Sequence, residues 1–393
     1  MKLKHILLSV AALGASAASA EGISYADWMS QLPDSTKVRN LSIPGSHDSA
    51  SSGVGTTLGG AKTQAYKISE QWDKGARAFD LRPNKNMDIY HGIASCNTSM
   101  KDVFETVVSK ISDSKEFAIF IIRYEEEADK GLLGTGKTDR PFFTSNLKSL
   151  LESYRDYIVE FSPSLKVKNV RGKIVVLVRD EFDSDLAASV RNYNSSQNLN
   201  DQKNASMSMG RTRVRLYVQD CFEYESNDVK QAMIKGMVDE SSANTYYPMW
   251  VVNHTSGYQG TSSSDSKVKD NAKAMNDYLA DYLTNNGVAT RAADEVNGKT
   301  GIVLMDYAGD DTYSGQKLID AVINQNQKYL TLGSEEDNDS DVETGVEEVE
   351  IDTDGEVEVY TVNGVSAGNS INNLEPGIYI LRQGEKSSKI VVK

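Results

Sequence analysis

The segment Val38-Arg-Asn-Leu-Ser-Ile-Pro-Gly-Ser-His47-Asp48-Ser49 shows a pattern that recurs along most of the chain. Its apolar residues predict a short buried strand. We expect Pro44-Gly45 to end that strand, because proline has no N–H to donate and glycine turns the chain. His47 can exchange protons near neutral pH, and Asp48 can orient an imidazole. Titratable groups just after a buried strand are typical of the chemistry of α/β barrels and open sheets.

Further apolar runs follow, and helical patterns separate them. Continuous Val/Ile/Leu runs indicate strands buried on both faces, which is typical of a parallel sheet covered by helices. Such runs are found at 76–81, 89–92, 117–123, 173–179, 214–220, 249–254 and 301–307. Helices are predicted at 24–32, 63–74, 100–111, 146–157, 268–284 and 315–329. This alternation predicts an α/β fold, namely a TIM-like (β/α) barrel, irregular in places, over residues 21–333.

The two ends of the chain differ from this central region. Residues 1–20 have a basic start, an apolar middle and the ending Ala18-Ser19-Ala20, the pattern of a cleaved secretory signal peptide, so we expect a secreted or cell-surface protein. Residues 334–355 are acidic and poor in apolar side chains, which predicts a solvated linker. Residues 356–393 alternate apolar and polar positions between turn signals, which predicts a small all-β module.

Composition restricts the function classes. Almost all of the formal net charge of −14 comes from the 13 acidic residues between Glu335 and Glu358, a stretch without Lys or Arg. The rest of the chain is therefore close to neutral, which is compatible with an anionic substrate, and no basic stripe indicates nucleic acid. The two cysteines, Cys96 and Cys221, fit either one disulfide of an exported protein or two separate buried thiols.

Ionisable side chains follow many of the predicted strands. Arg82 and His91 follow the second and third strands, and the later strand ends carry Arg123, Arg179, Asp220, His254 and Asp306. Intramolecular cleavage of a phosphodiester needs a base for the attacking hydroxyl, an acid for the leaving oxygen and a cation for the phosphate oxygens. Two imidazoles and a guanidinium supply these groups.

The ordered motifs resemble the bacterial phosphatidylinositol-specific phospholipase C family. They are Ser-Ile-Pro-Gly-Ser-His47-Asp48-Ser, Gly-Ala-Arg-Ala-Phe-Asp80-Leu-Arg82, Tyr-His91-Gly92, Arg-Gly-Lys-Ile-Val-Val-Leu-Val-Arg179, Val-Gln-Asp220 and Val-Leu-Met-Asp306-Tyr307, spread over residues 25–330. The last forty residues resemble the sorting domain of type IX secretion substrates, which implies recognition by secretion machinery. The first resemblance implies peripheral contact with membrane phosphatidylinositol, and we expect a monomer.

The phospholipase resemblance also implies roles for individual residues. His47 is the expected base, oriented by Asp306, and it takes the proton of the inositol 2-hydroxyl. His91, with Asp48 as its partner, is the expected acid that protonates the diacylglycerol oxygen. The guanidinium of Arg82 binds phosphate oxygens through its planar fork, with Asp80 as a brace. Because this cation takes the place that metal-coordinating carboxylates have in metal-dependent relatives, we expect no metal and no other cofactor.

Inositol hydroxyls need polar partners, and the resemblance assigns Arg123, Arg179 and Asp220 to them. Arg123 stands where better-known members carry lysine, and Phe222 where they place a stacking tyrosine, so Tyr224 is the candidate phenol. No catalytic role follows for His254. The resemblance implies release of diacylglycerol and inositol 1,2-cyclic phosphate, and extends the substrate class to glycosyl-phosphatidylinositol anchors.

Two alternatives remain open from the sequence. One is a metal-dependent glycerophosphodiester phosphodiesterase on a similar barrel, whose activity a chelator would abolish. The other is a non-catalytic surface protein that binds inositol lipids and leaves them intact.

Overall fold

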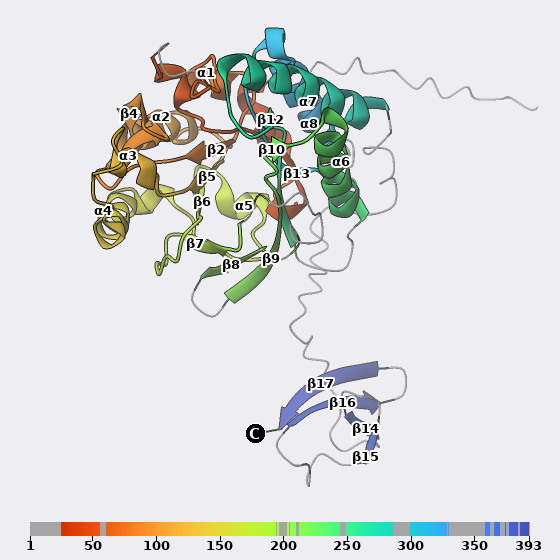
Figure 1. Cartoon of the computed structure of the whole chain (residues 1–393). Coiled ribbons are helices and arrows are strands. Elements are labelled where there is room, and N and C mark those ends of the chain that lie inside the picture. Colours follow the sequence, from red (N-terminus) through yellow and green to blue (C-terminus); the bar gives the residue numbers. More distant parts are fainter. Residues whose placement is uncertain are drawn as a thin grey trace, which may run out of the picture. The chain divides into compact units, whose positions relative to one another are not determined.

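The computed structural model consists of two compact units, Met1–Gly333 and Ser334–Lys393 (Figure 1). The residues it describes are 25–55, 60–193, 195, 203, 205–209, 212–243, 249–285, 299–327, 329, 358–361, 365–369, 374, 377–383 and 386–392. The expected signal peptide and acidic linker lie outside the described residues. Within these ranges, no helix combines the length and the apolar character needed to cross a membrane.

The first unit is built on a closed barrel of nine strands, which confirms the predicted α/β barrel. Around the barrel the order is β1-β13-β11-β9-β8-β7-β6-β5-β2. The strand bounds are β1 Ser42–Ser46, β2 Ala78–Leu81, β5 Ala118–Ile122, β6 Ile174–Val178, β7 Ala188–Arg191, β8 Ala205–Met209, β9 Thr212–Gln219, β11 Met249–His254 and β13 Gly301–Met305.

The irregularity of the barrel lies in β7 and β8. Strand β8 runs antiparallel to both of its neighbours, whereas β7 is parallel to β6. The sequence analysis did not find these two strands, because their short segments Ala188-Ser-Val-Arg191 and Ala205-Ser-Met-Ser-Met209 lack the long apolar runs of the parallel strands. They complete the barrel between β6 and β9.

The interpretation of Pro44-Gly45 as a strand end is wrong. Both residues lie inside β1, where they pair in register with Val303 and Leu304 of β13. A Cβ at position 45 would lie 2.5 Å from the carbonyl oxygen of Ala78 on β2, so glycine allows the close approach of the neighbouring strand. The strand therefore extends to Ser46 and ends directly before His47.

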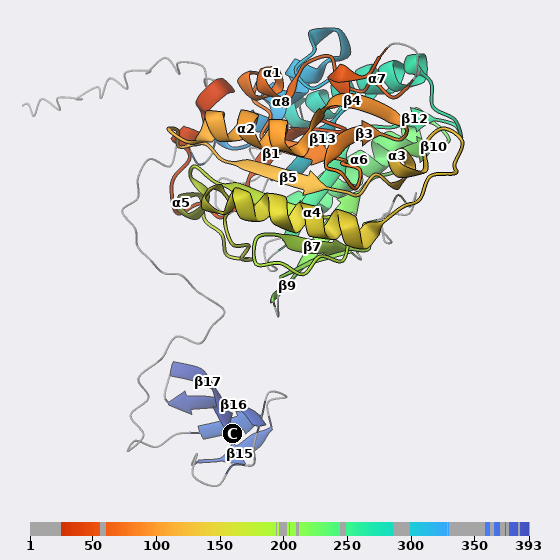
Figure 2. The same cartoon turned by 90° about the vertical axis from the view of Figure 1, so that its left-hand side faces the viewer.

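Helices pack around the barrel, as the ribbon views show (Figures 1 and 2). They are α1 Ile68–Asp73, α2 Met100–Ile111, α3 Glu126–Lys130, α4 Arg140–Ser153, α5 Val167–Val170, α6 Asn227–Ala243, α7 Asp265–Asn285 and α8 Gly315–Asn324. The sequence analysis predicted α2 at its observed bounds but did not find α6. Its predicted first helix, 24–32, is a 3-10 segment, Tyr25–Gln31.

Two small strand pairs lie outside the barrel sheet. Strands β3 (Asp88–His91) and β4 (Ala94–Ser99) form an antiparallel hairpin, so the run 89–92 is not a barrel strand as we expected. Strands β10 (Glu223–Tyr224) and β12 (Tyr258–Gln259) pair in parallel. Each pair follows the carboxyl end of a barrel strand, and the β3–β4 hairpin carries His91.

The second unit contains one four-stranded antiparallel sheet in the order β15-β14-β16-β17. Its strands are β14 Glu358–Thr361, β15 Ser366–Gly368, β16 Gly377–Gln383 and β17 Lys386–Val392. Val359 and Leu381 form its small buried cluster, which fits the limited core expected of a module of this size.

Candidate active site

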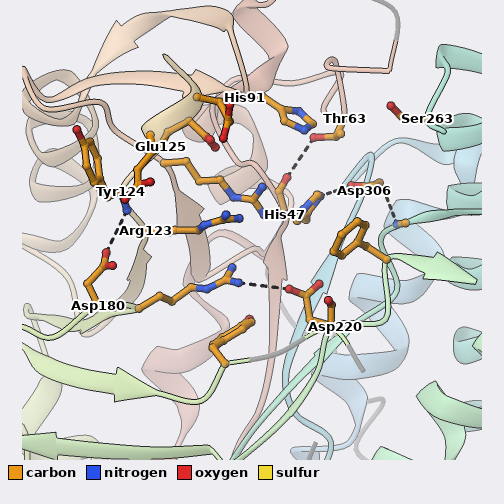
Figure 3. A pocket seen from close by; sticks show the side chains of 18 of the residues that line it. His47, Thr63, His91, Arg123, Tyr124, Glu125, Asp180, Asp220, Ser263 and Asp306 are labelled. Atoms are coloured by element: carbon orange, nitrogen blue, oxygen red, sulfur yellow. Dashed lines mark hydrogen bonds and ion pairs between the residues drawn. The ribbon is translucent and has the colours of Figure 1, made fainter. Parts of the chain in front are cut away.

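A cavity of about 690 Å³ lies at the carboxyl ends of the barrel strands (Figure 3). Of the predicted site residues, those that line it are His47, Arg82, His91, Arg123, Arg179, Asp220, Phe222 and Asp306. Asp48 and Asp80 lie directly behind this lining and contact Arg82. The structure therefore brings together side chains from positions 47 to 306 in one place.

His47 is held in one orientation by the end of β13 and by Gln64 from the loop before α1. Its backbone N–H donates to the carbonyl of Met305 at 2.9 Å, and its own carbonyl accepts from the Gln64 side chain at 2.7 Å. The ring Nδ1 lies 2.8 Å from Asp306 Oδ1, which carries the dashed line in Figure 3. Because a carboxylate accepts the Nδ1 proton, Nε2 is left to face the cavity and Arg82.

Asp48 connects the two predicted acid–base histidines. It follows His47 with a left-handed φ of 41°, a conformation that aspartate tolerates better than most residues. One of its oxygens, Oδ2, lies 3.2 Å from His47 Nε2 and 3.4 Å from His91 Nε2. The other, Oδ1, lies 2.8 Å from Arg82 Nε. A single carboxylate thus contacts both imidazoles and the guanidinium.

His91 reaches the same cavity from the β3–β4 hairpin. Its Nδ1 lies 2.8 Å from the carbonyl oxygen of Ala61, which can only accept, so Nδ1 carries a proton. Its Nε2 then faces Asp48. The ring centroids of His47 and His91 are 6.3 Å apart and the rings are nearly perpendicular. The Nε2 atoms of both histidines therefore lie within 3.4 Å of one Asp48 oxygen at the wall of the cavity.

Arg82 lies between these groups at the end of β2. Its Nη2 donates to Asp80 Oδ2 at 2.8 Å and lies 2.9 Å from His47 Nε2. Its buried Nε faces Asp48 without an aligned hydrogen bond. Burial opposes its charge, but Asp48 and Asp80 outweigh burial and raise the pKa of Arg82 well above its usual value. The guanidinium is thus a permanent cation at the cavity wall.

The charges around His47 favour its imidazolium form. Burial acts against that form, but Asp48 and Asp306 outweigh burial and raise the pKa of His47 to about 9. The contact with Arg82 acts in the opposite direction, because a guanidinium N–H can donate only to an unprotonated Nε2. Arg82 and Asp306 can both hydrogen-bond to His47 only when its imidazole is neutral. The neutral imidazole is also the form that can act as a base.

A second group of polar side chains occupies the cavity beyond Arg82. Arg179, from the end of β6, stacks on the Tyr193 ring at 3.5 Å and places Nη2 3.4 Å from Asp220 Oδ2. Its buried Nε and Nη1 have no hydrogen-bond partner among the described residues. Arg123 points into the same space in Figure 3. Guanidinium groups beside a carboxylate at the cavity wall fit a ligand rich in hydroxyl groups.

Phe222 and Tyr224 have different positions. Phe222 lines the cavity with 38% of its surface exposed. Tyr224 does not: it is buried, and its hydroxyl donates to Asn271 Oδ1 at 2.8 Å. The structure therefore corrects the assignment of Tyr224 as the phenol that replaces a stacking tyrosine, because its hydroxyl is buried against Asn271 of α7 and does not reach the cavity.

Two residues without a predicted role are part of the site. The Tyr193 hydroxyl lies 2.5 Å from His254 Nε2, and burial lowers the pKa of His254 to about 3 and raises that of Tyr193 well above its usual value. His254 Nδ1 then faces Asp220 Oδ1 at 3.5 Å. Tyr193 follows β7, one of the strands that the sequence analysis did not find, and no motif pointed to it.

Only one cluster among the described residues offers three ligand atoms suited to a metal ion, and it consists of His47, Asp48 and Asp80. Arg82 already contacts all three side chains. A divalent cation at this position would have to displace the guanidinium, so the donor set does not fit a metal centre. Cys96 and Cys221 are both buried and unbonded, which leaves the second of the two cysteine alternatives.

No family model matches the sequence. The 1-phosphatidylinositol phosphodiesterase of Listeria monocytogenes is 31% identical over 176 residues, which are 42% of this chain and 52%, or about half, of that enzyme. The 1-phosphatidylinositol phosphodiesterase of Staphylococcus aureus strain Newman is 23% identical over 323 residues, or 77% of this chain and 94% of that enzyme.

Solved structures give a similar result. The phosphatidylinositol-specific phospholipase C from Listeria monocytogenes has a TM-score of 0.59 at 23% identity and covers 77% of this chain and 99% of its own. A mutant of the enzyme from Staphylococcus aureus has a TM-score of 0.60 at 22% identity and covers 76% and 98%. The first unit therefore has the barrel fold of these phospholipases.

Proposed function

We propose that the first unit cleaves phosphatidylinositol by intramolecular attack of the inositol 2-hydroxyl on phosphorus, without a metal ion. The observation that carries this proposal is the position of Asp48, whose carboxylate contacts both imidazoles and Arg82. The names of the similar proteins and the shared barrel support the same substrate class.

In this reaction the proton of the 2-hydroxyl passes to His47 Nε2 while the hydroxyl oxygen bonds to phosphorus. The bond between phosphorus and the glycerol oxygen breaks, and His91 Nε2–H gives its proton to that oxygen. Arg82 offsets the charge that develops on the phosphate oxygens. The products are diacylglycerol and inositol 1,2-cyclic phosphate, and each proton transfer contributes on the order of 10²–10⁴ in rate.

The second group of polar side chains, around Arg179 and Asp220, binds the inositol ring. Asp220 accepts hydrogen bonds from hydroxyls, and the Arg179 guanidinium, which lines the cavity beside Asp220, donates to hydroxyl oxygens. Asp80 joins the two groups, since Oδ2 binds Arg82 and Oδ1 lies 4.0 Å from Arg179 Nη1. A ring held by Arg179 and Asp220 would direct its phosphate toward Arg82 and the two histidines.

Product analysis tests the proposal. The full chain is incubated with phosphatidylinositol vesicles in excess chelator, and phosphorus NMR follows the phosphate signal. We expect a five-membered cyclic phosphate together with diacylglycerol. Loss of cleavage in chelator would instead support the metal-dependent phosphodiesterase, and vesicle binding without any product would support the non-catalytic lipid-binding protein.

A further inference from the structure

The turn 305–308, at the end of β13, places Asp306 beside His47. Asp306 Oδ1 lies 2.8 Å from His47 Nδ1, the contact drawn between them in Figure 3. The next residue, Tyr307, has a left-handed φ of 52°. An aromatic residue keeps this unfavourable conformation only where surrounding groups impose it. The position of the Asp306 carboxylate therefore depends on the groups that hold this turn.

Gln64, in the loop before α1, holds the turn from one side. Its side chain is completely buried. The Nε2 group donates to the carbonyls of His47 at 2.7 Å and Met305 at 2.9 Å, and Oε1 accepts from the backbone N–H of Ala308 at 2.9 Å. One amide thus fixes the residue after β1 to both ends of the turn.

Asn276, in the middle of α7, holds the turn from another side. It is also completely buried. Its Nδ2 group donates to the carbonyl of Asp306 itself at 3.0 Å and to that of Tyr313 at 3.1 Å, and its Oδ1 accepts from the Thr255 hydroxyl at 2.7 Å. Because Thr255 directly follows β11, this amide joins the ends of β11 and β13.

An amide with the same kind of contacts lies at the opposite end of β1. Asn326 is 1% exposed and donates to the carbonyls of Ser42 at 2.8 Å and Ile323 at 3.1 Å. Its Oδ1 accepts from the N–H of Ser42, the first residue of β1, at 2.9 Å. Of these three buried amides, Gln64 and Asn276 contact the backbone of His47 or Asp306, whereas Asn326 contacts the start of the strand.

Loss of either amide at the carboxyl end would leave buried carbonyls without a donor and release part of the turn. Hydrogen bonds weaken steeply when their distance and angle change. The contact between Asp306 and His47 Nδ1 would therefore weaken first, because the turn that carries the carboxylate has lost its support. Loss of Asn326 would cost a similar number of hydrogen bonds but would leave this contact in place.

We propose that Gln64 and Asn276 are positioning residues for the base. They hold the Asp306 carboxylate against Nδ1 of His47, so that Nε2 keeps its direction toward Arg82 and the substrate. The catalytic consequence rests on the proposed function. The effect on the protonation of His47 does not, because it can be measured without any substrate.

The titration of His47 tests the inference directly. The ionisable groups that face it are Asp48, Asp80, Arg82, His91, Asp220, His254 and Asp306. Substitution of the amides keeps all of these groups. NMR of the full chain with ¹⁵N-labelled histidine follows the titration, and the spectrum of His47→Ala assigns the signal.

In the parent the pKa of His47 is raised to about 9. Asn276→Leu and Gln64→Met keep the volume of the side chains but remove their hydrogen bonds, and each should lower this pKa by about 1 unit. Asn326→Leu is the matched control and should keep the parent value. An unchanged pKa in the first two variants, or an equal fall in Asn326→Leu, would overturn the inference.

A milder pair of variants decides the point if Asn276→Leu does not fold. Thr255→Val removes only the hydroxyl that orients the Asn276 amide. The pKa of His47 should then fall in the same direction by a smaller amount. Thr255→Ser keeps the hydroxyl and should return the pKa to the parent value. Equal pKa values in the two Thr255 variants would overturn the role of Asn276.

Turnover of a monomeric, short-chain phosphatidylinositol separates this inference from the proposed function. Asn276→Leu should lower kcat on the order of 10-fold or more and leave KM near that of the parent, because Arg179 and Asp220 are unchanged. If the parent cleaves no substrate but the two amide variants still lower the pKa of His47, the proposed function fails and the positioning of His47 stands. If the parent cleaves the substrate and the variants keep its pKa and kcat, the inference fails and the function stands.

Discussion

The two ends of strand β2 carry two buried arginines with different surroundings. Arg77, before the strand, donates to Glu116 and to the carbonyls of Trp72, Ala76, Tyr25 and Ala26. Arg82, after it, contacts Asp80, Asp48 and His47 at the wall of an open cavity, and its Nε has no aligned acceptor.

The two arginines therefore have different roles: Arg77 contributes to stability, and Arg82 contributes to the candidate site. Arg77 is completely enclosed, and all of its contacts are structural: it joins the Tyr25–Gln31 segment, Glu116 and the carbonyls of Trp72 and Ala76 to the barrel. Arg82 is placed among groups that leave part of its binding capacity for a ligand. A buried arginine at a strand's amino end therefore indicates structure here, and one at the carboxyl end indicates a site, as in other α/β barrels.

The largest expected effect concerns the histidines beside Arg82. His47→Ala removes the group that accepts the inositol proton, and we expect kcat to fall on the order of 10²–10⁴-fold. Above about pH 9, where His47 is neutral in both the folded and the unfolded state, the free energy of unfolding should change little, because the ring serves the cavity more than the core. Steady-state kinetics and urea unfolding measure both quantities. His254→Gln, a buried imidazole 5.7 Å from His47 by ring centroids, is a comparison that keeps the acid–base pair.

Arg82→Lys should have the next largest effect. Lysine keeps the charge but offers it from a single point, so it cannot contact Asp80, His47 and a phosphate oxygen together. We expect kcat/KM to fall on the order of 10²–10³-fold, with an unfolding midpoint near that of the parent. Parent-like kinetics would exclude Arg82 from the phosphate site.

The same substitution at the other end of the strand should have the opposite result. Arg77→Lys leaves buried acceptors on Glu116, Tyr25 and Ala26 without their donors, at a cost of about 2–4 kcal/mol in the free energy of unfolding. At a temperature where this variant is folded, its kcat should equal that of the parent. A large loss of kcat with unchanged stability would show that the two ends of β2 do not divide their roles in this way.

Sequence patterns were sufficient for the barrel strands other than β7 and β8. Each buried strand between two helices is a continuous apolar run, as in Ala118–Ile122 and Ile174–Val178, and its end marks a site residue. The patterns failed for β7 and β8, whose short segments mix small and polar residues with few apolar ones; β8 is antiparallel to both of its neighbours.

The same limit applies to the site. His47, Arg82, His91 and Asp306 follow recognisable motifs, and the structure places all four on one cavity. Tyr193 follows β7, so the stacking of its ring on Arg179 could not be predicted without that strand. Tyr224 was offered as a substitute for the phenol missing at Phe222, and the sequence does not show that its hydroxyl bonds to Asn271 of α7.

The smallest expected effect concerns pH. Asp48 and Asp306 raise the pKa of His47 to about 9 against the effect of burial. Because the base must be neutral, kcat/KM of the parent should rise with pH up to about that value. Removing the charge in Asp48→Asn should lower the pKa of His47 by about 1–3 units, and the rising limb should move to lower pH by the same amount, with a reduced plateau because His91 loses its partner.

The free energy of unfolding should depend on the same pKa of His47, but it should fall as pH rises, whereas kcat/KM should increase. In the parent, folded His47 binds its proton more tightly than unfolded His47, so this stabilisation is complete below the unfolded pKa of about 6.5 and is lost as pH rises through about 9. The free energy of unfolding of Asp48→Asn should therefore fall less over this range than that of the parent. Asp270→Asn, which changes an exposed carboxylate on α7, should follow the parent in both measurements. If Asp48→Asn also leaves both profiles unchanged, Asp48 does not set the protonation of His47, and the division between the two ends of β2 would have to rest on Arg82 alone.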